Sequence, residues 1–186
     1  MSDFTIIYGS MFSGKTTRLI EEYNNSPLPD TEKIAIKPLL DNRYAAQRIS
    51  SHGGLQLPGH RVSKAEEIYP ICNDGIKEVY IDEIQFLGKS IPDVVLGILM
   101  QGIKVVASGL DRDYLGRPFG EMPRLMRMAN QKIQLQAKCF VCGKAAHYTY
   151  RTSGGEDLVL VGHTDMYESR CKTHWEEGMG HPLPEG

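Results

Sequence analysis

The sequence lacks several features that mark whole classes of protein. It has no run of about 18 consecutive apolar residues, so no membrane-spanning helix is predicted. Its first residues, MSDFTIIYG, do not place a basic segment before an apolar stretch, as a secretory signal would. The net charge is only −2, so the basic excess of a dedicated nucleic-acid binder is missing. We therefore expect a cytoplasmic protein whose partners include neither membranes nor nucleic acids.

The length and composition fit one soluble domain with a small appendage. Of the 186 residues, 41% are hydrophobic and 24% are charged. Short apolar runs alternate with segments of helical spacing, which predicts an α/β fold with a mainly parallel sheet. Strands are expected at residues 4–8, 33–38, 77–83 and 104–109, and helices at 15–24, 63–72 (capped by Ser63) and 91–102.

The remaining segments have a different character. Residues 40–60 are polar and contain glycine, which predicts a mobile, functional loop. From residue 138 onward, short strand-like pieces alternate with turns. We therefore expect an ATP-binding α/β domain at 1–137, a second small domain at 138–175 and a disordered tail at 176–186.

A glycine-rich segment between the first strand and the first helix predicts phosphate binding. It runs Gly9, Ser10, Met11, Phe12, Ser13, Gly14, Lys15, Thr16 and fits the pattern GxxxxGK[ST]. Glycine lets successive backbone N–H groups face an anion, and the helix N-terminus favours negative charge. Lys15 should reach the β- and γ-phosphates of a nucleotide, and Thr16 should hold Mg²⁺. The alternative is a glycine-rich turn with a chance lysine.

A second acidic element follows the strand that ends in VYIDE. In a parallel sheet the carboxyl ends of the strands line the ligand crevice, so Asp82 and Glu83 should face the bound phosphates. Asp82 suits Mg²⁺, and Glu83 could act as a general base or orient a nucleophile. A solvated acidic pair is the alternative, and an Asp-Glu pair fits ATPases and kinases equally.

Three of the four cysteines lie in two short pairs. Cys139 and Cys142 form a CxxC pair, and Cys171 and His174 form a CxxH pair 28 residues later. Such pairs can supply four tetrahedral ligands, which predicts a structural zinc site with no open position for a catalytic water. The fourth cysteine, Cys72, is expected to be a small core residue. His60, His147 and His181 are expected to be structural or exposed.

The order of these motifs resembles the type II thymidine kinases. The resemblance covers residues 4–175 and rests on GSMFSGKTT, DNRY with SSHGG, DEIQF, GLDRDYLGRPFG, and the CxxC and CxxH pairs around LVLVG and MYESR. It implies a RecA-like phosphate-loop domain with a zinc-ribbon-like lasso domain. It also implies transfer of the γ-phosphoryl of ATP to the 5′-hydroxyl of thymidine with Mg²⁺, a homotetramer, and feedback inhibition by dTTP.

The same resemblance assigns roles to individual residues. Glu83 takes the place of the general base. Together with the phosphate loop, the implied ATP and phosphate contacts are Asp82, Glu83, Ile84 and Gln85. The implied nucleoside contacts are Met11, Phe86, Leu110, Tyr114, Phe119, Thr149, Leu158, Val159, Leu160, Val161, Gly162 and Tyr167. The implied ligands are Cys139, Cys142, Cys171 and His174 for zinc, and Thr16 and Asp82 for magnesium.

Four positions depart from the family pattern. Tyr114 stands where phenylalanine is common, and His174 replaces a cysteine that some members have. Gly53 stands where an acidic residue can occur, and Ile84 stands where a small residue is usual. Arg151, Arg43 and Arg112 are candidates to stabilise the transferring phosphoryl group, and residues 151–167 are expected to act as a lid.

Two other functions stay open on the residues alone. A phosphate-loop ATPase with a zinc ribbon that binds nucleic acid would need a basic patch with aromatic residues near the cysteines. That region instead contains Glu156, Asp157, Asp165 and Glu168 among its basic residues. A small-molecule kinase with another acceptor is the second alternative, and only the family resemblance favours thymidine over it.

Overall fold

The computed structural model describes residues 2–40, 48–50, 56–152 and 166–180. Its centre is a six-stranded sheet with the strand order β5-β2-β6-β7-β1-β8, in which every pairing is parallel. The strands are β1 (Phe4–Tyr8), β2 (Lys33–Pro38), β5 (His60–Val62), β6 (Glu78–Ile81), β7 (Lys104–Gly109) and β8 (Gln131–Gln134). The expected α/β fold with a mainly parallel sheet is confirmed.

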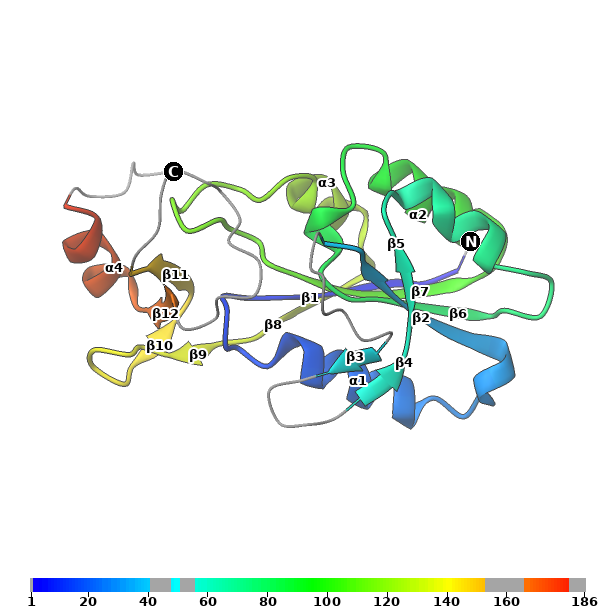
Figure 1. Ribbon diagram of the computed structural model, residues 1–186, viewed down its shortest axis with the longest axis horizontal. Helices are drawn as coiled ribbons and strands as arrows, with labels where there is room; N and C mark the ends of the chain where they lie inside the picture. The colour runs from blue at the N-terminus through cyan, green and yellow to red at the C-terminus, as the bar shows by residue number, and fades with distance from the viewer. Residues whose placement is uncertain (1, 41–47, 51–55, 153–165, 181–186) are drawn as a thin grey trace.

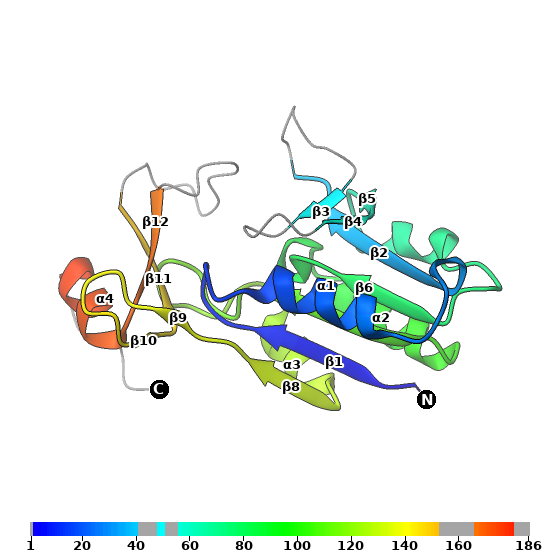
Figure 2. The same cartoon turned by 90° about the horizontal axis from the view of Figure 1, so that it is seen from below.

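Helices cover both faces of this sheet (Figures 1 and 2). Helix α1 (Lys15–Asn25) lies on one face, and α2 (Ile91–Met100) and α3 (Met122–Met128) lie on the other. Successive side chains of a strand point to opposite faces, so each face has its own core. In β1, Ile6 packs in the cluster that includes α2 and α3, whereas Ile7 packs with Leu19 of α1. This double burial explains why the strands are continuous apolar runs.

A smaller region follows β8 and lies at one end of the sheet (Figure 1). It holds two antiparallel strand pairs and a helix, namely β9 (Ala137–Lys138) with β10 (Ala145–Ala146), β11 (Tyr148–Arg151) with β12 (Tyr167–Arg170), and α4 (Lys172–Met179). The expected division at 137/138 falls inside β9. Helix α4 continues to Met179, so residues 176–179 are helical and not part of an unstructured tail. Residues 181–186 lie outside the described part.

Two local expectations were wrong. Residues 65–71 form a 3₁₀ helix, η2 (Ala65–Ile71), whose N-cap is Lys64 and not Ser63. Pro70 lies inside it and has no N–H to donate, which disfavours an α-helix there. The expected long loop contains strands β3 (Arg48–Ser50) and β4 (Gln56–Pro58), which pair with each other, and β5 follows directly. The other short helices are η1 (Asp30–Glu32) and η3 (Ile84–Phe86).

Within the described residues, no helix has both the length and the apolar character that crossing a membrane requires.

Candidate active site and metal centre

The phosphate loop connects β1 to α1 at the carboxyl edge of the sheet. Gly14 precedes the helix in the left-handed conformation, with φ 85°, which glycine adopts without steric cost. Gly9 is needed for another reason. A β-carbon there would lie 2.5 Å from the Leu135 carbonyl oxygen, just beyond β8. The loop is therefore shaped by its own glycines and by the neighbouring strand.

Lys15 points back into this loop. Its Nζ donates to the Ser10 carbonyl oxygen at 2.6 Å and lies 3.4 Å from the Ser13 hydroxyl. The residue as a whole is half-buried, but its ammonium group is enclosed by the loop. Desolvation by this enclosure lowers the pKa of Lys15 to about 8, although the carboxylates of Asp82, Asp111 and Glu83 act in the opposite direction.

Thr16 and Asp82 meet across the sheet edge. The Thr16 hydroxyl lies 3.2 Å from both carboxylate oxygens of Asp82, which is buried at the end of β6. Ile81 pairs with Ala107, so the next residue in β7, Ser108, lies beside Asp82 and donates to Oδ1 at 2.7 Å. These oxygen atoms are the hard ligands that Mg²⁺ prefers, and they fit the expected magnesium site.

Glu83 has an unusual backbone conformation. Its φ is 50° and its ψ is 43°, which is the left-handed region, rarely adopted by residues other than glycine. Such conformations occur often at functional sites, because they aim a side chain that regular structure could not. Because of this sharp turn, the side chains of Asp82 and Glu83 point in different directions. The Glu83 N–H donates to Asp82 Oδ1 at 3.1 Å.

The Glu83 carboxylate is accessible but crowded. Its side chain is 36% exposed, and Oε2 lies 3.8 Å from the Lys37 ammonium. Desolvation by the surrounding protein atoms and, second, the charge of Asp82 raise the pKa of Glu83, outweighing Lys37 and Lys15. A raised pKa makes this carboxylate a better proton acceptor, which suits the general-base role.

The residues after Glu83 support the site from behind. Ile84 is fully buried in the core, so its side chain is not available to ATP and any contact would come from its backbone. Gln85 is also buried, and its Oε1 accepts from the Leu110 N–H at 3.2 Å. Phe86 packs edge-on against Phe119 with 5.4 Å between ring centroids. This stretch ties the acidic turn to the loop that follows β7.

That loop, GLDRDYLGRPFG, is organised by Asp113. The Asp113 carboxylate is buried and accepts the backbone N–H groups of Leu115 and Arg117 at 2.9 and 3.0 Å. Its second oxygen lies 3.2 Å from Arg117 Nε. The loop therefore has a fixed shape, in which Tyr114 projects beside β11 of the small region.

Several expected nucleoside contacts come together between the two regions. The Met11 N–H in the phosphate loop donates to the Thr149 hydroxyl of β11 at 3.1 Å. Arg151 stacks on the Tyr114 ring and pairs in register with Tyr167 of β12. Phe119 belongs to the core cluster and supports Phe86, so it offers little open surface. Residues 158–162 lie outside the described part.

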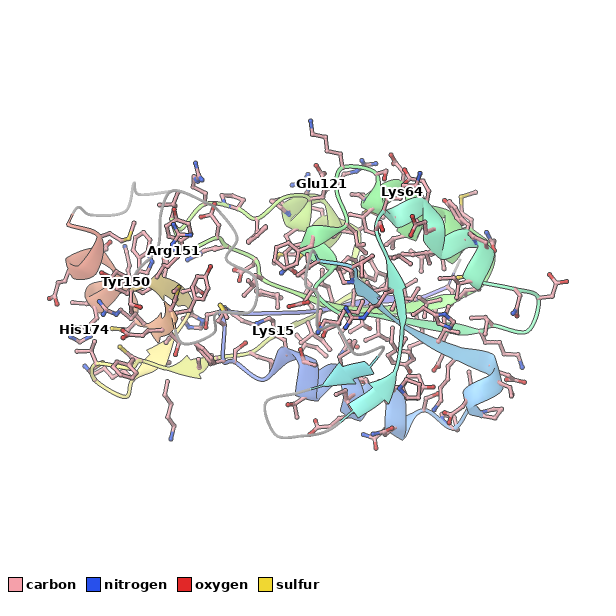
Figure 3. The ribbon with its side chains drawn as sticks, in the orientation of Figure 1. Lys15, Lys64, Glu121, Tyr150, Arg151 and His174 are labelled. Atoms are coloured by element: carbon pink, nitrogen blue, oxygen red, sulfur yellow. The ribbon has the colours of Figure 1, made fainter. Side chains whose placement is uncertain are left out.

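The arginine candidates occupy different places. Arg151 donates to the Tyr114 hydroxyl at 2.9 Å, whereas Arg112 lies 4.7 Å from the centre of the Tyr148 ring. Arg43 and Gly53 are outside the described residues. Figure 3 shows Arg151 in the small region with Tyr150 and His174, and Lys15 at the end of the sheet that faces this region.

The four expected zinc ligands form one cluster. The ligand atoms of Cys139, Cys142, Cys171 and His174 lie within 4.8 Å of one another. A tetrahedral zinc with bonds of about 2.3 Å to sulfur and about 2.0–2.1 Å to nitrogen needs ligand atoms about 3.5–3.8 Å apart. The measured separations are 3.9 Å for Cys142 Sγ to Cys171 Sγ, and 3.6 and 3.2 Å from His174 Nδ1 to Cys139 Sγ and Cys171 Sγ. The residues fit zinc, with Nδ1 as the imidazole ligand.

The surroundings of Cys139 favour a thiolate. Desolvation raises the pKa of the Cys139 thiol, but hydrogen bonds from the backbone N–H groups of Cys171, Cys142 and Val141 outweigh it and lower the pKa to about 6. Thiolates are the form that binds zinc. Cys72 lies elsewhere and packs against the main core, as expected.

The comparison with known proteins identifies the family. The family model described as "Thymidine kinase" matches residues 2–175. The chain belongs to the thymidine kinase family. A relative named thymidine kinase, from Bdellovibrio bacteriovorus (strain ATCC 15356 / DSM 50701 / NCIMB 9529 / HD100), is 37% identical over 177 residues, which cover 95% of this chain and 87% of the relative.

Three residues at the site were not predicted from the sequence. Lys37 faces Glu83, and Ser108 holds Asp82. Both stand near the carboxyl ends of predicted strands, so the sheet-edge rule that found Asp82 could also have found them. Trp175 contacts both Thr149 and Tyr114, and no local motif marks it.

Proposed function

We propose that the chain transfers the γ-phosphoryl group of ATP to the 5′-hydroxyl of thymidine, giving dTMP and ADP. The observation that supports phosphoryl transfer is the distance of 3.2 Å between the Thr16 hydroxyl and the Asp82 carboxylate, with Glu83 next in the chain. Family membership carries the choice of thymidine. The nucleoside would lie between the phosphate loop, the loop after β7 and strand β11.

Enzymes accelerate phosphoryl transfer mainly by positioning the reactants and by compensating the charge on the phosphate oxygens. The backbone N–H groups of residues 9–16 would hold the β- and γ-phosphates. Lys15, which donates to the Ser10 carbonyl at 2.6 Å, has only to turn outward to reach them. Thr16 and Asp82 would hold Mg²⁺, which neutralises charge on the phosphate oxygens when it is bound.

Glu83 would take the proton of the attacking hydroxyl. Its carboxylate is partly exposed, and its pKa is raised, so it accepts a proton more readily than an ordinary glutamate. Lys37, 3.8 Å away, would keep the carboxylate in place and ionised enough to act. The proton leaves the hydroxyl as the bond from oxygen to phosphorus forms.

Zinc would be held by Cys139, Cys142, Cys171 and His174, where it would cross-link the ends of the small region and add no chemistry of its own. The protein segments around the zinc site would position the nucleoside contacts. Helix α4 begins at the zinc ligands and packs against β11, which carries Thr149 and Arg151.

The nucleic-acid alternative has little support in the described part of the small region. Arg170 donates to Glu168 at 2.8 and 3.0 Å and stacks on Tyr150. Arg151 is engaged with Tyr114. Arginines committed to internal partners do not form the basic, aromatic surface that single strands need.

A nucleoside competition assay tests this function. We expect kcat/KM to be highest for thymidine. For deoxyuridine it should be lower by a factor of about 10–200, since one methyl group is worth roughly 1–3 kcal/mol. For deoxycytidine it should be about 10⁴-fold lower, because the reversed donor and acceptor pattern of cytosine would leave buried polar groups unpaired. ATP consumption should not respond to single-stranded DNA. Comparable values for thymidine and deoxycytidine would contradict the thymidine assignment.

Family membership also leads us to propose a homotetramer, inhibition by dTTP and a cytoplasmic location. Sedimentation in solution and inhibition assays with dTTP test the first two.

A further inference from the structure

The largest fully buried side chain of the described structure, Trp175, connects the zinc site to the proposed nucleoside pocket. It follows the zinc ligand His174 in the first turn of α4 and is 1% exposed. The backbone N–H of Trp175 donates to the Cys171 carbonyl at 2.9 Å, which ties the backbone of this residue to the metal-binding turn.

The indole N–H of Trp175 is shared between two carbonyl groups. It lies 3.1 Å from the Thr149 oxygen of β11 and 3.3 Å from the Tyr114 oxygen of the loop after β7. These two residues belong to separate segments, strand β11 and the loop after β7, and both segments border the proposed pocket. Their only shared donor among the described hydrogen bonds is this single N–H.

One further bond extends the connection to the phosphate loop. The Thr149 hydroxyl accepts the backbone N–H of Met11 at 3.1 Å. Trp175 therefore reaches three expected nucleoside contacts, two through its own hydrogen bond and one through Thr149. A merely space-filling tryptophan would need the ring but not the N–H.

We propose that Trp175 is a positioning residue for the nucleoside, whose shared N–H sets the distance between Thr149 and Tyr114. This inference rests on the proposed location of the nucleoside pocket. Trp175 would hold the side chains that contact the base in a fixed position relative to the zinc-binding turn. Without the N–H, both carbonyl groups lose this donor, and the distance between Thr149 and Tyr114 is less tightly fixed.

The test removes the N–H while leaving the fold in place. Because the sequence contains one tryptophan, growth on β-(benzothiophen-3-yl)alanine replaces only Trp175 and exchanges the N–H for sulfur at nearly constant shape. Trp175→Phe is the genetic counterpart. A change that weakens binding of substrate and transition state equally raises KM and leaves kcat unchanged. We therefore expect the thymidine KM to rise about 5- to 50-fold, while kcat and the ATP KM stay within about twofold of the parent.

Tyr150→Phe is the matched control. Tyr150 also lies on β11, and its hydroxyl donates to the Gly178 carbonyl of α4 at 3.3 Å. This variant loses one hydrogen bond between the same two elements but keeps the shared donor of the Thr149 and Tyr114 carbonyls, so its thymidine KM should stay within about twofold of the parent. Zinc content, measured in every protein, should be unchanged.

Three results would overturn the proposal. The first is a parent-like thymidine KM in both proteins that lack the N–H. The second is an equal rise in Tyr150→Phe, since general loosening of α4 would then explain the effect. The third is a KM rise in Trp175→Phe alone, with the benzothiophene protein unaffected, since the cause would then be lost volume. If the parent itself fails to phosphorylate thymidine, the proposed function is wrong, and this failure is distinct from the other three.

Discussion

Arg151 lies over the ring of Tyr114, with the guanidinium carbon 3.8 Å from the ring centre, and donates to the hydroxyl of the same tyrosine at 2.9 Å. The two residues come from different regions, β11 and the loop after β7. Phenylalanine at this position could provide the stacking but not the hydrogen bond.

This pair should stabilise the contact between the two regions. We expect Tyr114→Phe to lower the free energy of unfolding by about 1 kcal/mol, since a hydrogen bond to a charged donor is lost. Arg151→Ala should cost more, because the stacking is lost as well. A double-mutant cycle measured by denaturant unfolding at fixed protein concentration should give a coupling energy of about 1 kcal/mol, and additive effects would contradict the direct interaction.

Replacing Glu83 tests the general base. Glu83→Gln keeps the shape of the side chain but cannot accept the proton, so kcat should fall by about 10²–10⁴-fold while ATP binding stays close to the parent value. Glu22→Gln is a suitable control, because Glu22 pairs with Arg18 on α1, where about a third of each side chain is exposed. Its activity should be unchanged, since exposed ion pairs contribute little. Parent-like turnover in Glu83→Gln would require a different base.

The zinc ligands can be tested against the fourth cysteine. We expect a single zinc ion per chain in the purified protein, a loss of zinc and of activity in Cys139→Ser, and neither loss in Cys72→Ser. Metal analysis by mass spectrometry provides the measurement. Full zinc content in Cys139→Ser would remove Cys139 from the ligand set.

Cys72 should also differ in reactivity. Desolvation raises the pKa of its thiol to about 11. Because the thiolate is the reactive form, alkylation by iodoacetamide should be slow at about pH 8 and should rise about tenfold per pH unit up to the pKa. After zinc is removed with a chelator, Cys139, Cys142 and Cys171 should react first, as peptide mass spectrometry can show. Rapid labelling of Cys72 at neutral pH would contradict the raised pKa of this partly buried thiol.

The parts that the sequence predicts well are those that depend on neighbouring residues in the chain. The phosphate loop is one continuous motif, and the buried strands are continuous apolar runs. Strands β3 and β4 were missed because each has three residues, too few for a periodic pattern. At the site, Lys37 and Ser108 were missed because their roles depend on which strands are neighbours in the sheet. Trp175 has a role only because α4 packs against β11, which no local pattern reveals.

The position of β1 in the sheet has a consequence for how the chain folds. β1 is the first strand to be synthesised, but it lies between β7 and β8, so its hydrogen-bonding partners at residues 104–109 and 131–134 come far later. Contacts between distant segments form slowly, because the intervening chain must first be ordered. On a ribosome, the nucleotide-binding loop would therefore remain incomplete until most of the protein had emerged. We expect nascent chains that end before β8 to have no affinity for ATP.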